Sequence, residues 1–127
     1  MTLVDTSVWI DAFRGGESAA LLKSLLDSGE VCVNDIVLTE LLPSIRIRGE
    51  SELEALLLAL PRTFMSIDWS ELVQMQSENL KHGLNKVGLP DLMIAQNAMQ
   101  NGLQLCSLDR HFRLMAEIMP LSVRTGD

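Results

Sequence analysis

The sequence has few of the side chains that bind soft metals. Among its 127 residues there are two cysteines, two histidines and no tyrosine. Cys32 and Cys106 lie inside separate apolar segments, with no CxxC spacing and too few histidines nearby to complete a zinc site. This pattern predicts two buried thiols and argues against a disulfide or a structural zinc ion.

Basic residues and long apolar runs are also scarce. Ten Lys and Arg against 17 Asp and Glu give a formal net charge of −7. This balance argues against a broad nucleic-acid-binding surface, because nonspecific affinity grows with the number of phosphates that Lys and Arg neutralise. No apolar run approaches the roughly 20 residues of a membrane span, and the start MTLVDTS lacks the features of a signal peptide. We therefore expect a cytoplasmic protein with no membrane association.

The length and composition indicate one folded unit. A chain of 127 residues, 47% apolar and 21% charged, is typical of a single globular domain. At this size roughly two-thirds of the surface exposed by the unfolded chain becomes buried. With no linker, repeat or low-complexity segment in the sequence, we expect one domain over residues 1–127.

Short apolar segments alternate with segments of helical periodicity. The predicted strands are 2–4, 31–33, 64–67, 103–106 and 121–123. The predicted helices are 8–13, 17–27, a helix from Asp35 towards Gly49 that Pro43 should kink, 50–60, 70–85, 90–100 and 109–117. Strands that alternate with helices imply right-handed crossovers and a parallel sheet covered on both faces, which is an α/β fold.

Four acidic residues lie near the predicted ends of these elements. They are Asp5 in LVDTS, Glu40 in LTELL, Asp91 in LPDLMIA and Asp109 in SLDRHF. Asp5 and Asp109 follow predicted strands, and ligands of parallel sheets bind beyond the carboxyl ends of the strands. Carboxylate oxygens suit Mg²⁺ or Mn²⁺ better than softer metals. The hypothesis from the residues is a metal-dependent phosphodiester hydrolase.

Each acid also has a structural interpretation. Asp5 and Asp109 lie beside helix starts, where Asp is favoured as a cap, and the charge of Asp91 complements the dipole of its helix. Glu40 can lie on the solvent-facing edge of its helix. The residues alone leave these alternatives open.

Four blocks of the sequence, taken together, resemble a known family. The blocks VDTSVWIDAFRG, LTELL, LPDLMIAQNA and LQLCSLDRHF are similar, in the same order, to the signature segments of PIN-domain proteins, specifically the small VapC-type toxins of prokaryotes. The resemblance spans nearly the whole chain. It implies a three-layer α/β/α fold in which helices flank a short central parallel sheet of about four to five strands, as a single PIN domain.

The resemblance also implies an activity. PIN toxins of this kind are endoribonucleases that use Mg²⁺ or Mn²⁺ to activate a water molecule for attack on RNA, leaving a 5′-phosphate and a 3′-hydroxyl. Carried over by motif, the catalytic metal ligands are Asp5, Glu40, Asp91 and Asp109. Thr6 and Ser107 would orient these ligands or a water molecule. The implied partners are a VapB-type antitoxin, a tRNA or rRNA substrate and a second copy of the chain.

Three arginines are candidates for contact with RNA phosphates or with the antitoxin. Arg14 ends the first block, and Arg46 and Arg48 form the segment IRIRG. Solvent-exposed arginines without a role are the alternative.

Three other functions are weighed against the metal-dependent nuclease. A degenerate PIN domain that serves as an RNA- or protein-binding scaffold would lack some of the acids, and all four are present. A receiver-like or phosphatase-like protein would use Asp5 as phosphate acceptor, but a phosphatase expects a second aspartate where Ser7 stands. A metal-free ribonuclease normally needs a positioned acid and base, and His82 and His111 lie in unrelated segments.

Overall fold

The computed structural model describes residues 1–125, and a parallel sheet forms their centre. The strands are β1 (Thr2–Val4), β2 (Val31–Cys32), β3 (Gln104–Ser107) and β4 (Ser122–Thr125). Their order in the sheet is β2-β1-β3-β4, and every pair is parallel. In register, Leu3 of β1 lies between Cys32 of β2 and Leu105 of β3. All three side chains are buried, as expected for a parallel sheet covered on both faces.

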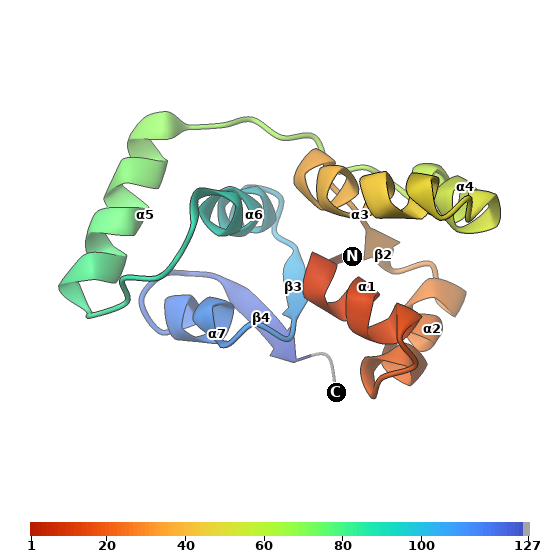
Figure 1. The fold of residues 1–127 in the computed structure, drawn as a ribbon. Coiled ribbons are helices and arrows are strands. Elements are labelled where there is room, and N and C mark those ends of the chain that lie inside the picture. Colours follow the sequence, from red (N-terminus) through yellow and green to blue (C-terminus); the bar gives the residue numbers. More distant parts are fainter. Residues whose placement is uncertain (126–127) are drawn as a thin grey trace.

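Helices cover both faces of the sheet. In the described part of the chain they are α1 (Thr6–Phe13), α2 (Ser18–Asp27), α3 (Asp35–Ile47), α4 (Ser51–Ala59), α5 (Trp69–Lys81), α6 (Leu89–Gln100) and α7 (Arg110–Ala116). Figure 1 shows α1 and α2 on one side of the strands and α6 and α7 on the other. This is the arrangement that right-handed crossovers produce when the chain leaves β1 and β3 in opposite directions. The predicted α/β/α fold is confirmed.

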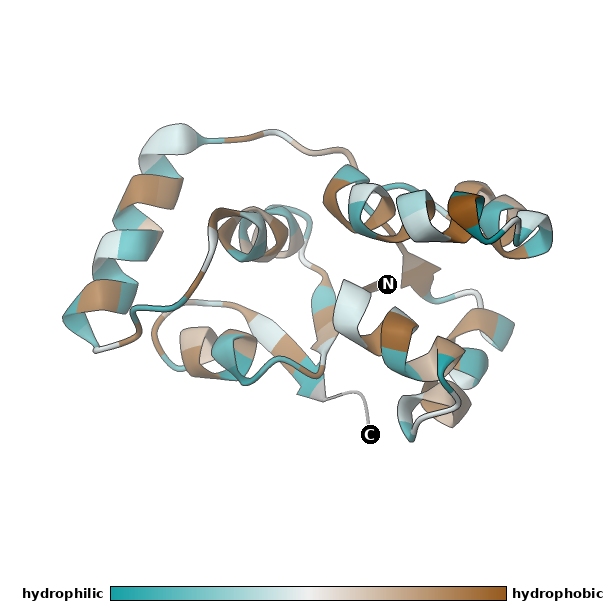
Figure 2. Ribbon diagram, viewed as in Figure 1, coloured by the Kyte–Doolittle hydropathy of each residue, from teal (hydrophilic) through white to brown (hydrophobic). Residues whose placement is uncertain are grey.

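The core lies between the sheet and these helices. Its largest fully buried side chains include Trp9, Phe112, Leu57 and Ile94. The buried indole of Trp9 donates a hydrogen bond to the carbonyl of Val4 over 3.2 Å, which fixes α1 against the strand that precedes it. On α5, farther from the sheet, apolar and polar bands alternate along the helix (Figure 2), as in a helix with one packed face.

The predicted buried thiols are confirmed for Cys32 and Cys106, which form no disulfide in the described residues. No helix within residues 1–125 has both the length and the apolar character needed to cross a bilayer.

The predicted strand 64–67 is wrong. Within this connector only Arg62 forms a β-bridge, to Val33. Two carbonyls that a strand partner would bind accept hydrogen bonds from α6 side chains instead: Asn97 Nδ2 donates to Phe64 O over 2.9 Å, and Gln100 Nε2 to Ser66 O over 2.8 Å. The connector is extended and apolar, but side-chain amides satisfy its backbone.

The predicted helix 70–85 is four residues too long, because α5 ends at Lys81. Gly83 has φ +76°, a left-handed conformation that glycine adopts without strain. The N–H of Leu84 then returns to the carbonyl of Asn79 over 2.8 Å, which closes the end of the helix. Pro43, where a kink is predicted, lies inside α3, and the helix continues past it to Ile47.

Candidate metal centre

The direction of chain progression across the sheet reverses between β1 and β3, and the first and fourth acids follow these two strands. Asp5 comes directly after β1, and its N–H donates to Cys106 O of β3 over 2.8 Å. Asp109 follows β3 after one intervening residue. Such a reversal point is where α/β sheets bind ligands, beyond the carboxyl ends of their strands.

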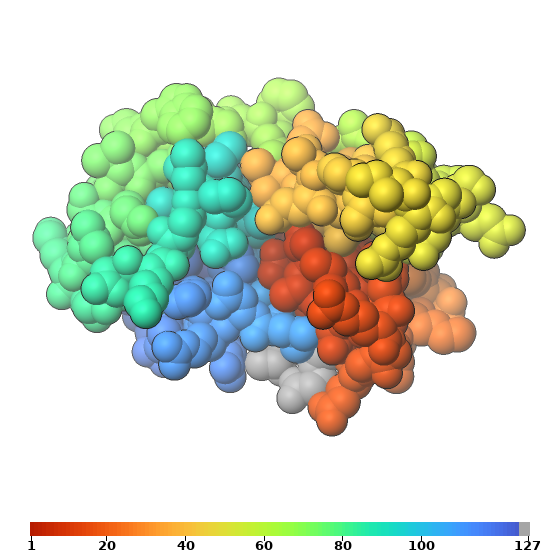
Figure 3. Space-filling model, in the orientation of Figure 1, coloured from red at the N-terminus to blue at the C-terminus, as the bar shows by residue number. Residues whose placement is uncertain are grey.

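The other two acids come from helices that reach the same region. Asp91 lies in the first turn of α6, where Pro90 supports the helix start, and Glu40 lies midway along α3. On the face shown in Figure 3, atoms of the N-terminal segment (red), α3 (orange), α6 (teal) and the segment after β3 (blue) meet. The fold therefore brings together four segments that are distant in sequence.

The Asp5 carboxylate is 6% exposed and is held by two hydroxyl groups. Ser7 Oγ and Ser107 Oγ donate to its Oδ2 atom over 2.8 and 2.9 Å. The side chain makes no capping hydrogen bond to α1. The helix-cap interpretation of Asp5 is therefore wrong, and its carboxylate is held towards the end of the sheet.

The remaining predicted orienting residue contacts Glu40. Thr6 Oγ1 donates to Glu40 Oε1 over 2.9 Å, so this hydroxyl at the start of α1 links that helix to α3. Glu40 is exposed, which agrees with the solvent-facing alternative for its position, but the side chain is tethered towards Asp5 through Thr6. Thr6 and Ser107 both make the contacts required of groups that orient carboxylates.

Asp109 does cap its helix. Its Oδ1 atom accepts the N–H of His111 over 2.9 Å at the start of α7, and His111 Nδ1 lies 2.9 Å from the same oxygen. The capping interpretation is correct for this residue. It leaves Oδ2 without a hydrogen bond from the described residues, so a cap and a ligand are compatible roles.

Asp91 is the acid without a hydrogen-bonding partner. No donor among residues 1–125 binds its carboxylate, although the residue is half-buried. Burial, followed by the charges of Asp109, Asp5 and Glu40, raises the pKa of Asp91 from 3.8 to about 6. The charge of His111 acts in the opposite direction. The four carboxylates are thus close enough to repel one another.

The donor chemistry fits a hard divalent cation. All four acids offer oxygen atoms, and at least one oxygen of each accepts no hydrogen bond in the described part of the chain. The side chains do not form a closed cage: within residues 1–125, no three acidic, histidine or cysteine side chains are close enough together to hold an ion.

The three candidate arginines lie away from the acids. Arg14 follows the last residue of α1, about 14 Å from Asp5 at the rise of an α-helix. Arg46 Nε pairs with Glu54 Oε1 over 2.6 Å, and Arg48 is exposed just after α3. The structure does not bring any of them to the carboxylates.

Sequence reasoning missed Ser7. A hydroxyl three residues after a strand and at a helix start is typical of a cap, so the local pattern favours capping over a bond to Asp5. The signal that could have found it is the run Asp5-Thr6-Ser7, in which two hydroxyls follow an acid at the end of a buried strand.

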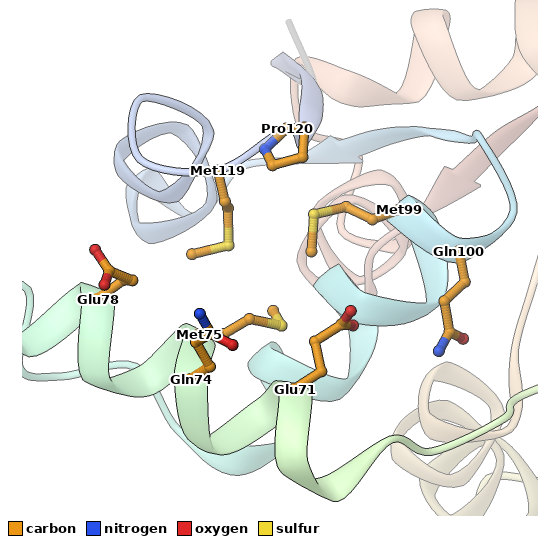
Figure 4. A pocket seen from close by; sticks show the side chains of 8 residues that line it. All are labelled: Glu71, Gln74, Met75, Glu78, Met99, Gln100, Met119 and Pro120. Atoms are coloured by element: carbon orange, nitrogen blue, oxygen red, sulfur yellow. The ribbon is translucent and has the colours of Figure 1, made fainter.

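An apolar pocket of about 360 Å³ lies elsewhere, between α5, α6 and the segment after α7. In Figure 4 the side chains of Met75, Met99 and Met119 extend into the same space from these three segments. None of the four acids lines it. Its walls are mostly apolar, and the two carboxylates at its edge, Glu71 and Glu78 of α5, are not members of the carboxylate cluster, so the pocket is separate from that site.

Comparison with known proteins identifies the family. Residues 2–118 match the PIN domain. The chain is 28% identical over 123 residues to Ribonuclease VapC19 of Mycobacterium tuberculosis, covering 94% of this chain and 98% of that protein. In solved structures, VapBC2 from Rickettsia felis bound to a promoter DNA fragment matches with a TM-score of 0.75 at 20% identity, and FitAcB from Neisseria gonorrhoeae with 0.75 at 22%. Each match covers 99% of this chain and 98% of the other. Because the family match spans nearly the whole sequence and the fold agrees with it, this chain belongs to the PIN domain family.

Proposed function

We propose that the chain is a VapC-type toxin, an endoribonuclease that requires Mg²⁺ or Mn²⁺ and is neutralised by a VapB-type antitoxin. The observation that supports this most directly is the state of Asp91. Its carboxylate is half-buried and has no hydrogen-bond donor in the described residues, so burial, followed by the charges of three further acids, raises its pKa. Such a carboxylate has no cationic partner among the described residues, and carboxylates whose pKa values are shifted in this way cluster at functional sites.

The residues that would hold the ion are Asp5, Glu40, Asp91 and Asp109. A bound divalent cation would lower the pKa of a water molecule and stabilise charge on the attacking and leaving oxygens of an in-line displacement. The chain's own contribution is to position the ligands. Thr6 restrains Glu40 and Ser107 restrains Asp5, each over 2.9 Å.

Binding of RNA would depend on a few local contacts. The net charge of −7 disfavours long-range attraction, and the cation would offset part of the negative charge around the acids. Arg14 and Arg48 are exposed at the far ends of α1 and α3, so they would contact phosphates distant from the scissile bond or contact the antitoxin. Arg46 would first have to leave Glu54.

The antitoxin and a second copy of the chain are the proposed protein partners. The similar structure from Rickettsia felis is named as VapBC2, and another similar structure, from Klebsiella pneumoniae, is named as a toxin–antitoxin complex. A shallow groove between α1 and α4, lined in part by Phe13, Leu53 and Leu56, supports such a partner. Phe13 and Leu56 are 40% and 41% exposed, and an apolar helix face would bury them.

The test is cleavage of total cellular RNA by the purified protein with Mg²⁺ or Mn²⁺, with EDTA, and by the Asp5→Asn and Asp91→Asn variants. The matched control is Asp27→Asn, which removes an exposed carboxylate paired only with Lys23. We expect discrete cuts with 5′-phosphate ends from the wild type and the control. We expect no such cuts when EDTA is present or when either site variant replaces the wild type.

A catalytically degenerate PIN domain that binds RNA or protein is the competing function. The absence of a closed ligand cage within residues 1–125 favours it. Intact RNA in every reaction, with no Mn²⁺ bound in a calorimetric titration of the wild type, would establish the scaffold and refute the nuclease.

A further inference from the structure

Two hydrogen-bonded chains run in parallel from the loop after β3 to one oxygen of Asp5. In the first, the N–H of Leu108 donates to Ser7 Oγ over 3.1 Å, and Ser7 Oγ donates to Asp5 Oδ2 over 2.8 Å. In the second, the N–H of Asp109 donates to Ser107 Oγ over 3.0 Å, and Ser107 Oγ donates to the same Oδ2 over 2.9 Å. Both hydroxyls therefore link the backbone before α7 to the first acid.

The direction of each chain follows from the chemistry of its members. A backbone N–H can only donate, an ionised carboxylate can only accept, and a hydroxyl has one proton to give. Each serine accepts from the loop, so its single proton is committed to Asp5. The two Oγ atoms are 3.3 Å apart, but neither has a proton left for the other.

These bonds give the two carboxylate oxygens of Asp5 different environments. Oδ2 receives two hydrogen bonds, which occupy the two lone-pair directions of a carboxylate oxygen. Oδ1 accepts none from the described residues. Only Oδ1 thus has its lone pairs available for a cation.

We propose that Ser7 is a positioning residue for the metal centre. With Ser107 it occupies Oδ2, so that Asp5 presents Oδ1 as a single ligand atom. Through Leu108 it also holds the loop that leads into Asp109 at a fixed place relative to Asp5. The role of Ser7 towards a cation rests on the proposed function, whereas the link between Ser7 and the loop does not.

Binding of Mn²⁺ measures the first part of this role without requiring catalysis. Calorimetric titrations would compare the wild type with Ser7→Ala, with Ser7→Thr, which retains a hydroxyl, and with Ser77→Ala. Ser77 is the matched control because its hydroxyl bonds only the carbonyl of Val73 on the exposed face of α5. We expect Ser7→Ala to weaken binding by about 10-fold or more, the effect of removing a partner that orients a ligand. Ser7→Thr and Ser77→Ala should bind within about two-fold of the wild type, well below that loss.

Hydrogen exchange of single backbone amides in the metal-free protein measures the second part. Ser7→Ala should speed exchange at Leu108 more than at Asp109, and Ser107→Ala should do the opposite, because each hydroxyl accepts from one of these amides. A general loss of stability would speed both amides alike in either variant.

The outcomes separate the two proposals. If the wild type binds no Mn²⁺, the proposed function fails, and the role of Ser7 towards a cation fails with it. If the wild type binds Mn²⁺ and Ser7→Ala binds it equally well, only the positioning role is overturned. It is also overturned if Ser7→Thr binds as weakly as Ser7→Ala, or if Ser7→Ala leaves exchange at Leu108 unchanged.

Discussion

Polar side chains at the start and in the middle of α6 have opposite environments. At its start, Asp91 has a half-buried carboxylate, no hydrogen-bond donor within residues 1–125 and a raised pKa. About one and a half turns later, Gln96 and Asn97 are each 1% exposed, and the oxygen and nitrogen of each side-chain amide are hydrogen-bonded. Gln96 bonds both backbone groups of Asp68, and Asn97 joins Phe64 O to the side chain of Asn34.

This difference separates what holds the fold together from what is available for binding. Buried amides that find partners cost little to desolvate and fix the elements around them. Asn97 and Gln96 in this way attach the α4–α5 connector to α6. An unpaired carboxylate among like charges destabilises the metal-free fold, and proteins retain such groups where function needs them. One helix therefore carries a structural polar region and a reactive one.

The largest expected effect is on activity at the start of the helix. Asp91→Asn keeps the size of the side chain but removes its charge, so a divalent cation loses one ligand. We expect cleavage to fall by about 100-fold or more, the scale on which removal of one charge-stabilising group acts. Single-turnover cleavage at saturating Mn²⁺ measures it. Activity within about three-fold of the wild type, far inside that range, would mean that Asp91 is no ligand.

The second effect is on stability in the middle of the helix. Asn97→Ala removes the partner of Phe64 O and of Asn34, leaving buried polar groups without hydrogen bonds. We expect the free energy of unfolding to fall by about 1–3 kcal/mol, measured by urea denaturation. Asn85→Ala, at an exposed loop position, is the control and should change it by about 0.5 kcal/mol or less. Activity per folded molecule should persist in Asn97→Ala. Loss of activity in a folded Asn97→Ala protein would show that the start and the middle of α6 are not independent.

The sequence predicts the helix and the acid at its start, but not the hydrogen bonds that distinguish Asp91 from Gln96 and Asn97. The order of strands and helices and the four acidic segments follow from local periodicity and motif. The connector 64–67 was mistaken for a strand because its apolar residues indicate one, while the amides that bind it lie about 30 residues further along. The lack of a donor for Asp91 and the role of Ser7 depend on which segments meet in space, and no local pattern reports that.

The third effect is the pH dependence of stability in the metal-free protein. The folded-state pKa of Asp91 is raised to about 6 from 3.8, so its protonated form favours folding, and this contribution is present below pH 4 and lost as pH rises through 6. Asp91→Asn cannot ionise. We expect it to be more stable than the wild type at pH 7, by on the order of 1–2 kcal/mol, and to lose this advantage by pH 4.

Urea denaturation of both proteins in EDTA, from pH 4 to pH 7.5, measures the difference. Comparing the variant with the wild type at each pH cancels the titration of groups distant from Asp91. A stability difference that does not change with pH would show that neither burial nor the neighbouring acids raise the pKa of Asp91 in the folded protein.

The smallest effect tests whether the side-chain amides of Asn97 and Gln100 hold the α4–α5 connector together or independently. Gln100 Nε2 donates to Ser66 O over 2.8 Å at an exposed position, so Gln100→Ala should lower the free energy of unfolding by about 0.5–1 kcal/mol. Gln100 and Asn97 lie one turn apart and hold the same connector. Once Asn97→Ala releases Phe64, the connector is less ordered and the bond of Gln100 stabilises the fold less. In a double-mutant cycle the loss from both changes should therefore be smaller than the sum of the single losses. Strict additivity would mean that each amide holds its own carbonyl independently, and that the connector is not fixed as a unit.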